Sequence, residues 1–205
     1  MKIDMKVLAV VAMVLIGGTA AEQALPHAVS RGAKQPDTGD NESAIPYIVD
    51  RVTDGDTIVV RRGSARPITV RALGIDTPET RDPRTPVQCY GPQAGAYAVR
   101  TLAGQRVTLS CDTTAGRLDK YGRTLAYIWL GPQLYNQQAI QLGYAHEYIY
   151  DQHHPYQRQA AFTAAEADAR THHRGLWAAN TCNGDTRQPV DNTATKTLPP
   201  AGRSR

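Results

Sequence analysis

The order of extended and helical segments is the feature that most restricts what this chain can fold into. Apolar residues alternate along short segments, which predicts strands at residues 47–52, 57–61, 68–73, 107–111 and 124–130. Helical spacing of apolar residues predicts helices at residues 91–102, 136–142 and 156–170. Since a helix interrupts the strands once, after the third, the segments do not alternate as they do in a parallel α/β sheet.

The turn between the first two extended segments adds a strong hairpin signal. Asp54-Gly55 lies between residues 47–52 and residues 57–61, and an Asp-Gly pair between two alternating apolar segments predicts a tight hairpin. Neighbouring antiparallel strands with late helices favour an α+β fold. We therefore predict a five-stranded antiparallel barrel of the oligonucleotide-binding (OB) kind with three packed helices.

The beginning of the chain has the layout of a cleavable secretory signal. Lysines precede an apolar run from Val7 to about Gly17, and small residues follow as far as Ala21. This pattern predicts a signal peptide at residues 1–21, removed near its end. An uncleaved membrane anchor or a core helix is the alternative, although the run is shorter than the ~20 residues that a membrane span needs.

The rest of the chain has room for one domain and two polar segments. Residues 22–44 are polar and lack periodicity, which predicts a flexible linker, and residues 183–205 predict a disordered tail. The folded domain is expected at residues 45–182. With the signal removed, we expect a secreted or otherwise extracytoplasmic protein with no attachment to the membrane.

Three cysteines, Cys89, Cys111 and Cys182, allow at most one internal disulfide in an exported chain. Cys111 falls at an inward position of the alternating run 107–111, which favours a buried apolar role for it. The pairing of Cys89 with Cys182 is therefore favoured. Neither the number nor the spacing of the cysteines suggests a zinc site.

The charge balance leaves the partner of this protein open. The formal net charge is +4, which is modest for a chain of this length. Such a charge is compatible with a polyanionic partner but does not require one. The positions of individual acidic and basic residues are therefore more informative than their total.

Two acid-rich turns carry the strongest chemical signal. Residues 54–57 read Asp-Gly-Asp-Thr, and residues 76–79 read Asp-Thr-Pro-Glu. Calcium prefers carboxylate and carbonyl oxygens, which makes Asp56 and Asp76 candidate metal ligands. Each turn alone is an ordinary turn former. Their occurrence together, on either side of a strand that carries Arg71, favours a cation site.

Arg71 and Arg123 are the candidate phosphate ligands. Arg71 lies in an alternating apolar segment, so its side chain either faces inward and is paired, or lies on an exposed face of the barrel. Arg123 begins the last strand after a Lys-Tyr-Gly turn, where a lone arginine is commonly a solvated turn residue. Two guanidiniums that converge on one phosphate would donate bidentate hydrogen bonds.

Five motifs, taken in order, resemble the staphylococcal nuclease (thermonuclease) family. They are Asp-Gly-Asp-Thr at 54–57, Val-Arg at 70–71, Gly-Ile-Asp-Thr-Pro-Glu-Thr at 74–80, Tyr-Gly-Pro-Gln-Ala at 90–94 and Asp-Lys-Tyr-Gly-Arg-Thr-Leu-Ala-Tyr at 119–127. The resemblance covers about residues 47–177 with small differences in length. It implies an OB barrel with three helices, which agrees with the strand order.

The resemblance also implies an activity and a metal. The family hydrolyses DNA and RNA in a calcium-dependent reaction that leaves 3′-phosphate products. At the matching positions of this sequence, calcium would be held by Asp56, Asp76 and the backbone carbonyl of Thr77. Asp54 matches an acid that supports this site from outside. DNA and RNA are the expected partners, no stable protein partner is implied, and a monomer is the default.

The remaining matches concern catalysis and substrate binding. Glu79 matches the carboxylate that orients or deprotonates the attacking water, and Arg71 and Arg123 match the catalytic arginines. The matches for substrate-binding groups are Lys120, Tyr121, Tyr148 and Tyr150. The first two would hold a terminal phosphate of the nucleotide, and the other two would lie near its sugar and base. The segment 143–150 is one residue shorter than the family pattern.

Two rival functions remain. A nucleic-acid-binding module that had lost catalysis would show substitutions at the acidic or arginine positions, whereas all of them are present. A histidine-metal nuclease would use the pairs at 153–154 and 172–173, but adjacent helical residues point ~100° apart and do not chelate one ion together. We expect these histidines to be exposed, and Trp177 to be a core anchor for the last helix.

Overall fold

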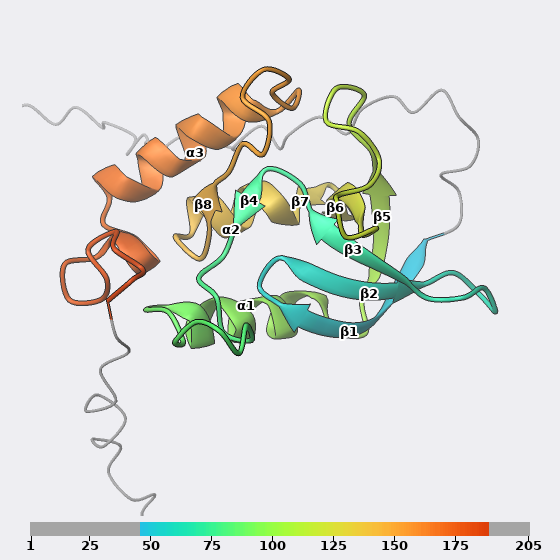
Figure 1. Cartoon of the computed structure of the whole chain (residues 1–205), viewed down its shortest axis with the longest axis horizontal. Helices are drawn as coiled ribbons and strands as arrows, with labels where there is room; N and C mark the ends of the chain where they lie inside the picture. The colour runs from blue at the N-terminus through green and yellow to red at the C-terminus, as the bar shows by residue number, and fades with distance from the viewer. Residues whose placement is uncertain (1–45, 189–205) are drawn as a thin grey trace, which may run out of the picture. The chain divides into compact units, whose positions relative to one another are not determined.

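Five strands close a barrel at the centre of the computed structural model, which describes residues 46–188 (Figure 1). The barrel strands are β1 (Tyr47–Asp54), β2 (Thr57–Arg61), β3 (Ile68–Ala72), β5 (Arg106–Ser110) and β6 (Thr124–Leu130). Their order is β3-β2-β1-β5-β6, and a further pairing between β3 and β6 closes the barrel. β7 (Gln133–Leu134) pairs with β6, and β4 (Ile75–Asp76) pairs with β8 (His146–Glu147) in a separate sheet.

The predicted barrel with three helices is confirmed, and one strand pairing in it is parallel rather than antiparallel. β3 and β6 run in the same direction, with Val70 opposite Thr124 and Ala72 opposite Ala126. Alternation of apolar residues within a strand is the same for either direction, so it does not reveal this pairing. The long connection through α1 and β5 makes the parallel closure possible.

β1 changes its register with β2 twice along its length. The shifts lie between Val49 and Arg51 and between Val52 and Asp54, and each is the kind of irregularity that bends a strand and increases its local twist. β1 also pairs with β5 at its other edge, through Tyr47 and Ile48. Bending of this kind allows a small number of short strands to close into a barrel.

The helices are α1 (Gly91–Leu102), α2 (Tyr135–Gln141), α3 (Gln159–Thr171) and the short 3₁₀ helix η2 (Gly175–Trp177). α1 packs on β1, α2 packs on β6, and α3 packs on α2 (Figure 1). The predicted bounds of the first helix are confirmed, and the second begins one residue earlier than predicted. α3 begins at Gln159 rather than at residue 156, because residues 156–159 form a turn in which the N–H of Gln159 donates to the carbonyl of Tyr156 (3.1 Å).

The core fills the barrel and the space under α2 and α3. Its largest fully buried side chains include Trp129, Tyr135, Phe162, Ile58, Ile75, Leu102, Ile128 and Ile140. Burial of each such side chain stabilises the fold by about 1.5–3 kcal/mol. Asn136 is buried among them, and its side chain accepts from the N–H of Ile128 (2.9 Å) and donates to the carbonyl of Leu73 (2.8 Å). This side chain therefore ties α2 to β6 and to the chain that leaves β3.

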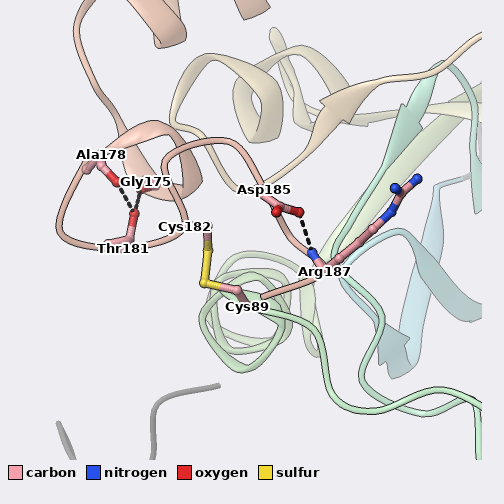
Figure 2. Close-up of a disulfide and its surroundings, with 7 residues drawn as sticks. All are labelled: Cys89, Gly175, Ala178, Thr181, Cys182, Asp185 and Arg187. Atoms are coloured by element: carbon pink, nitrogen blue, oxygen red, sulfur yellow. Dashed lines mark hydrogen bonds between the residues drawn. A yellow bond between two sulfur atoms is a disulfide. The ribbon is translucent and has the colours of Figure 1, made fainter. Parts of the chain in front are cut away.

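A second, smaller cluster lies beside the end of α3. It contains Ala169, Leu176, Trp177 and Cys182. Cys182 forms a disulfide with Cys89, with their Cα atoms 5.8 Å apart (Figure 2). The predicted pairing of these cysteines is thus confirmed, and so is the role of Trp177 as a buried anchor.

The prediction that Cys111 is buried is wrong. Its thiol is free and its side chain is exposed. The reason is that β5 ends at Ser110, so the alternation that seemed to include Cys111 stops one residue before it.

The termini lie mostly outside the described residues. The predicted signal at 1–21, the linker at 22–44 and the tail from residue 189 cannot be compared with the structure, which begins at Pro46 and ends at Gln188. Ordered structure extends past the expected boundary at Cys182, because the carbonyl of Thr186 accepts from the N–H of Cys89 (3.0 Å). None of the helices within residues 46–188 has the length and apolar character needed to cross a membrane.

The carboxylate of Asp112 joins three parts of the fold. It is buried, and it accepts hydrogen bonds from the N–H and hydroxyl of Thr114, the hydroxyl of Tyr127 on β6 (2.6 Å) and the N–H of Gln157 before α3 (2.8 Å). Burial raises the pKa of Asp112, but these hydrogen bonds outweigh it and the pKa is lower than the ordinary 3.8. The ionised form is therefore the one that stabilises the fold.

We expect Asp112→Asn to lower the free energy of unfolding at pH 7 by about 2 kcal/mol, the contribution typical of hydrogen bonds to a charged group. Because the folded pKa is depressed, the stabilisation is fully present above the unfolded pKa and is lost as the pH falls through the folded one. Urea denaturation should therefore show the two proteins converging below about pH 4. Asp50→Asn, at the surface pair with Arg61, is the control and should change stability by less than about 1 kcal/mol. A constant difference at all pH values would contradict the prediction.

Candidate active site

The tip of the β1–β2 hairpin presents the first acidic turn. Asp54 ends β1 and pairs with Thr57 across the turn. The hydroxyl of Tyr135, from α2, donates to the carbonyl of Gly55 and fixes the tip from below. Gly55 is required there by space, because a Cβ would lie 2.7 Å from the side chain of Thr77. The tip is therefore packed directly against the second acidic turn.

Asp56 links the two acidic turns through its carboxylate. Its Oδ2 accepts from the backbone N–H of Thr77 (3.1 Å) and from the Thr77 hydroxyl (3.0 Å), and its Oδ1 accepts from the hydroxyl of Thr57 (2.9 Å). Asp56 is buried, at 8% relative exposure. The sequence separates these turns by about twenty residues, and the fold brings them into direct contact.

Arg71 lies between the two acidic turns and is paired with both. It sits on β3 opposite Thr57 of β2, and its side chain is only 14% exposed. The guanidinium forms ion pairs with the carboxylates of Asp56 and Asp76, the latter with an N–O distance of 2.8 Å. Of the two alternatives for this residue, the inward and paired one is therefore correct. Removal of either acid would leave part of a buried charge without a partner.

Negative charge is concentrated around this arginine. Burial raises the pKa of Asp54 to about 6, and the nearby carboxylates of Asp56 and Glu79 add to the rise. Burial and the charge of Asp56 likewise raise the pKa of Asp76, although Arg71 opposes them. Carboxylates that raise each other's pKa values in this way form a site where a cation relieves the repulsion between them.

The donor atoms available here fit a hard cation. Within residues 46–188, no three side chains of His, Cys, Asp or Glu gather in a metal-binding arrangement. Asp56 and Asp76 converge on one guanidinium, and Thr77 lies between them in the fold. Two carboxylates and a backbone carbonyl are oxygen ligands that suit calcium, with water and substrate oxygens completing its shell.

Glu79 lies in a turn of backbone N–H groups. Its Oε1 accepts from the N–H of Thr80 (2.8 Å), Arg81 (2.6 Å) and Asp82 (3.1 Å). Burial raises the pKa of Glu79, but these hydrogen bonds and a contact with Asp54 outweigh it and lower the pKa below the ordinary value. The backbone of its own turn therefore stabilises the ionised form of Glu79.

A pocket of about 360 Å³ opens beside Arg71. Of the residues predicted to form the site, the pocket is lined by Arg71, Asp76, Lys120, Tyr121, Arg123, Tyr148 and Tyr150. The structure thus brings both arginines and all four predicted substrate-binding residues together. Asp54, Asp56, Thr77 and Glu79 are not among the residues that line this pocket, and Asp56 is connected to it through its ion pair with Arg71.

The parallel closure of the barrel explains how Arg123 reaches Arg71. Thr124, the first residue of β6, pairs with Val70 of β3. Arg123 directly precedes Thr124, so it lies beside β3, the strand that carries Arg71. Asp119 then fixes Arg123, since its carboxylate accepts from the arginine Nε (2.6 Å) and from the arginine backbone N–H (2.9 Å). The sequence motifs include Asp119 but assign it no role of its own. Its position four residues before the arginine, across a turn, was the available signal for this contact.

The exposed aromatic and basic side chains lie at the mouth of the pocket. The ring of Tyr121 lies 5.1 Å from Lys120 Nζ and 5.3 Å from Arg123 Cζ. A hydrogen bond with Tyr121, together with the nearby Tyr150 and Tyr148, raises the pKa of Lys120, so that its charge is retained. Tyr121, Tyr148 and Tyr150 all keep large exposed ring surfaces.

The paired histidines lie on the surface of the protein. His154 contacts Asp151 (2.9 Å) and His172 contacts Asp168 (2.9 Å), each on the surface. The prediction that these histidine pairs are exposed is confirmed. His154 does border the pocket together with Asp151, but among residues 46–188 no three side chains of His, Cys, Asp or Glu form a metal-binding group.

In a comparison with known proteins, this chain is similar to several nucleases. The family model described as "Staphylococcal nuclease homologue" matches residues 69–179. The thermonuclease of Staphylococcus hyicus is 38% identical over 137 residues, which are 67% of this chain and 78% of that protein. The thermonuclease of Staphylococcus intermedius is 39% identical over 131 residues, 64% of this chain and 75% of that protein. Endonuclease YncB of Bacillus subtilis (strain 168) is 32% identical over 146 residues, 71% of this chain and 67% of that protein.

These matches agree with the resemblance read from the motifs. The family model spans the second acidic turn, both arginines and the residues that line the pocket, and it begins after the hairpin tip that carries Asp56. It covers more than half of the sequence, and the first of the thermonucleases is matched over 78% of its own length. The chain therefore belongs to the staphylococcal nuclease family.

Proposed function

We propose that this nuclease hydrolyses phosphodiester bonds in both DNA and RNA, that it depends on calcium, and that it leaves 3′-phosphate products. One observation carries the proposal: the guanidinium of Arg71 pairs with Asp56 and Asp76 at the wall of a pocket that also holds Arg123. Acids that can hold a cation and arginines that can hold a phosphate thus share one small volume. Such an arrangement suits metal-assisted hydrolysis of a phosphodiester, in which positive charge stabilises the phosphoryl oxygens.

Asp56, Asp76 and the backbone carbonyl of Thr77 would hold the calcium ion. When bound, the ion supplies positive charge that polarises the phosphodiester and brings a water molecule close to it. Asp54 would support this group from behind, since it accepts from the N–H of Gly55 (2.9 Å) and the hydroxyl of Thr80 (3.1 Å) and so fixes both acidic turns.

Arg71 and Arg123 would neutralise the charge that builds up on the phosphoryl oxygens. Each guanidinium is already oriented before substrate arrives, Arg71 by Asp76 and Arg123 by Asp119. Donors fixed in advance need little reorganisation during the reaction, and this is the main source of their effect on rate. The same ion pairs partly neutralise the positive charge of both arginines while no phosphate or cation is bound. A bound phosphate or cation would change how that charge is shared.

Glu79 would manage the attacking water. Its lowered pKa keeps it ionised at neutral pH, which suits a carboxylate that accepts a hydrogen bond from water and orients it. A strong general base works best with a pKa near the operating pH. The hydrogen bonds to Oε1 therefore favour orientation of the water over complete removal of its proton.

Substrate binding would rest on stacking and on phosphate contacts. Tyr148 and Tyr150 would lie near the sugar and base, while Lys120 and Tyr121 would contact a terminal phosphate. Such contacts carry little sequence information, because every base has a ring face and every nucleotide has a phosphate. We therefore propose cleavage with little sequence preference.

An extracytoplasmic location is part of the proposal. The Cys89–Cys182 disulfide supports it, because disulfides persist in oxidising compartments and are rare in the cytosol. The predicted signal at residues 1–21 supports it independently. We propose a secreted or envelope-located monomer that acts on nucleic acid without a stable protein partner.

The metal requirement can be measured directly. Purified protein and an Asp56→Ala variant are incubated with plasmid DNA and with RNA, in calcium, in magnesium and in chelator. We expect cleavage of both substrates in calcium, with 3′-phosphate ends, and loss of cleavage in chelator and in the variant. Binding without cleavage under all conditions would instead indicate a binding module. Cleavage that survives in Asp56→Ala would indicate a different metal centre.

Replacement of Arg123 by alanine should lower kcat by at least about 10²-fold, the loss typical of one transition-state donor. Arg61→Ala is the matched control, because Arg61 is an exposed arginine paired with Asp50 away from the pocket. Steady-state kinetics on a defined oligonucleotide should show near wild-type turnover for the control. Equal turnover of the two variants would remove Arg123 from the proposed mechanism.

A further inference from the structure

The turn that carries Glu79 is held by a residue that the proposed mechanism does not include. The side-chain Oε1 of Gln88 accepts from the backbone N–H of Glu79 (2.8 Å), and the backbone N–H of Gln88 donates to the carbonyl of Glu79 (2.9 Å). Both polar groups of the Glu79 backbone are thus occupied by one residue. Gln88 is not among the residues that line the pocket.

Gln88 is in turn fixed by the disulfide next to it. Cys89 is bonded to Cys182, and its backbone N–H donates to the carbonyl of Thr186 (3.0 Å). Figure 2 shows the disulfide joining the loop after η2 to the coil at the start of α1. A covalent bond and a backbone hydrogen bond therefore connect the neighbour of Gln88 to the end of the described chain.

The segment on the other side of the disulfide is itself rigidly attached. The hydroxyl of Thr181 donates to the carbonyls of Gly175 (2.6 Å) and Ala178 (2.9 Å) (Figure 2). The N–H of Gly184 donates to the carbonyl of Leu176 (2.9 Å). Since Leu176 is buried against the end of α3, the attachment extends to the body of the fold.

The backbone beside Cys89 is constrained in two further ways. Tyr90 has φ 68°, a left-handed conformation that is unfavourable for tyrosine and persists only where surrounding contacts impose it. Its ring stacks on Tyr144 with centroids 5.7 Å apart. The next residue, Gly91, leaves no room for a side chain, because a Cβ would lie 2.6 Å from Thr80 Cγ2 and 3.2 Å from the carbonyl oxygen of Glu79.

We propose that Gln88 is a positioning residue for Glu79 and that the Cys89–Cys182 disulfide, with residues 178–188, forms the brace that fixes Gln88. The C-terminal part of the domain thereby contributes to turnover although it does not border the pocket. This inference rests on the proposed role of Glu79. It predicts a specific kinetic signature, because Gln88 acts on the group that manages water and not on the groups that bind substrate.

Gln88→Met removes the acceptor oxygen while nearly preserving the shape of the side chain. We expect kcat to fall roughly 10- to 100-fold, as for a catalytic group displaced by a fraction of an ångström to an ångström, with KM unchanged. Gln88→Glu keeps an oxygen at the same position and should recover most of the lost turnover. A fall in kcat that Gln88→Glu does not recover, or an effect on KM alone, would overturn the inference.

A double-mutant cycle with Glu79→Gln separates this inference from the proposed function. If Gln88 acts through Glu79, Gln88→Met lowers kcat in the wild-type background and has little effect in the Glu79→Gln background. Unchanged turnover in Glu79→Gln alone would contradict the proposed function. A slow Glu79→Gln variant with a fully active Gln88→Met variant, or an equal loss in both backgrounds, would contradict the positioning role only.

The brace is tested with the Cys89→Ser/Cys182→Ser variant, assayed well below its melting temperature. We expect a lower kcat and an unchanged KM. Added calcium should not restore the lost kcat. Val107→Ala is the matched control, because it removes buried core volume on β5, and Val107 is neither among the residues that line the pocket nor near the disulfide in the chain. If the two variants lose stability equally but only the cysteine variant loses turnover, the brace is supported. Full turnover in the cysteine variant would overturn it.

Discussion

The guanidinium of Arg71 forms ion pairs with two carboxylates from different turns. These two ion pairs determine how the parts of the site are arranged. A buried guanidinium without partners would cost several kcal/mol, so the hairpin tip and the segment around β4 must meet at β3. Asp56 strengthens this meeting by accepting two hydrogen bonds from Thr77. Tyr135 and Asn136, both on α2, donate hydrogen bonds to the backbone carbonyls of Gly55 and Leu73, which fixes the hairpin tip and the end of β3 relative to α2. The helices thus matter to the chemistry because they fix where these charges meet.

Local patterns in the sequence predict the elements of this fold well and their long-range relations less well. The Asp54-Gly55 turn, the helix at 91–102 and the last barrel strand follow from local periodicity and turn chemistry. The parallel pairing of β3 with β6 does not, since it depends on the path of the chain between them. Cys111 was misplaced for a related reason, because alternation does not show where a strand ends.

The site divides in the same way. Ordered motifs were enough to single out Arg71, Asp76, Glu79 and Arg123 as candidates, but they could not decide whether Arg71 faced inward. The register of β3 with β2 decides that. The charge states are harder to predict from the sequence. The low pKa of Glu79 comes from hydrogen bonds to backbone N–H groups, which residues of almost any type could supply. The role of Gln88 could not be predicted either. A glutamine before a cysteine forms no sequence pattern that indicates a hydrogen bond to Glu79, nine residues earlier in the chain.

The turn at residues 119–122 couples two properties of the pocket. Its exposed tip carries Lys120 and Tyr121, while the carboxylate of Asp119 at its start accepts from the Nε of Arg123 just after it. The backbone N–H groups of Tyr121 and Arg123 donate to the same carboxylate. A change in the length of this turn would therefore move the exposed tip and Arg123 together, so that neither can vary alone.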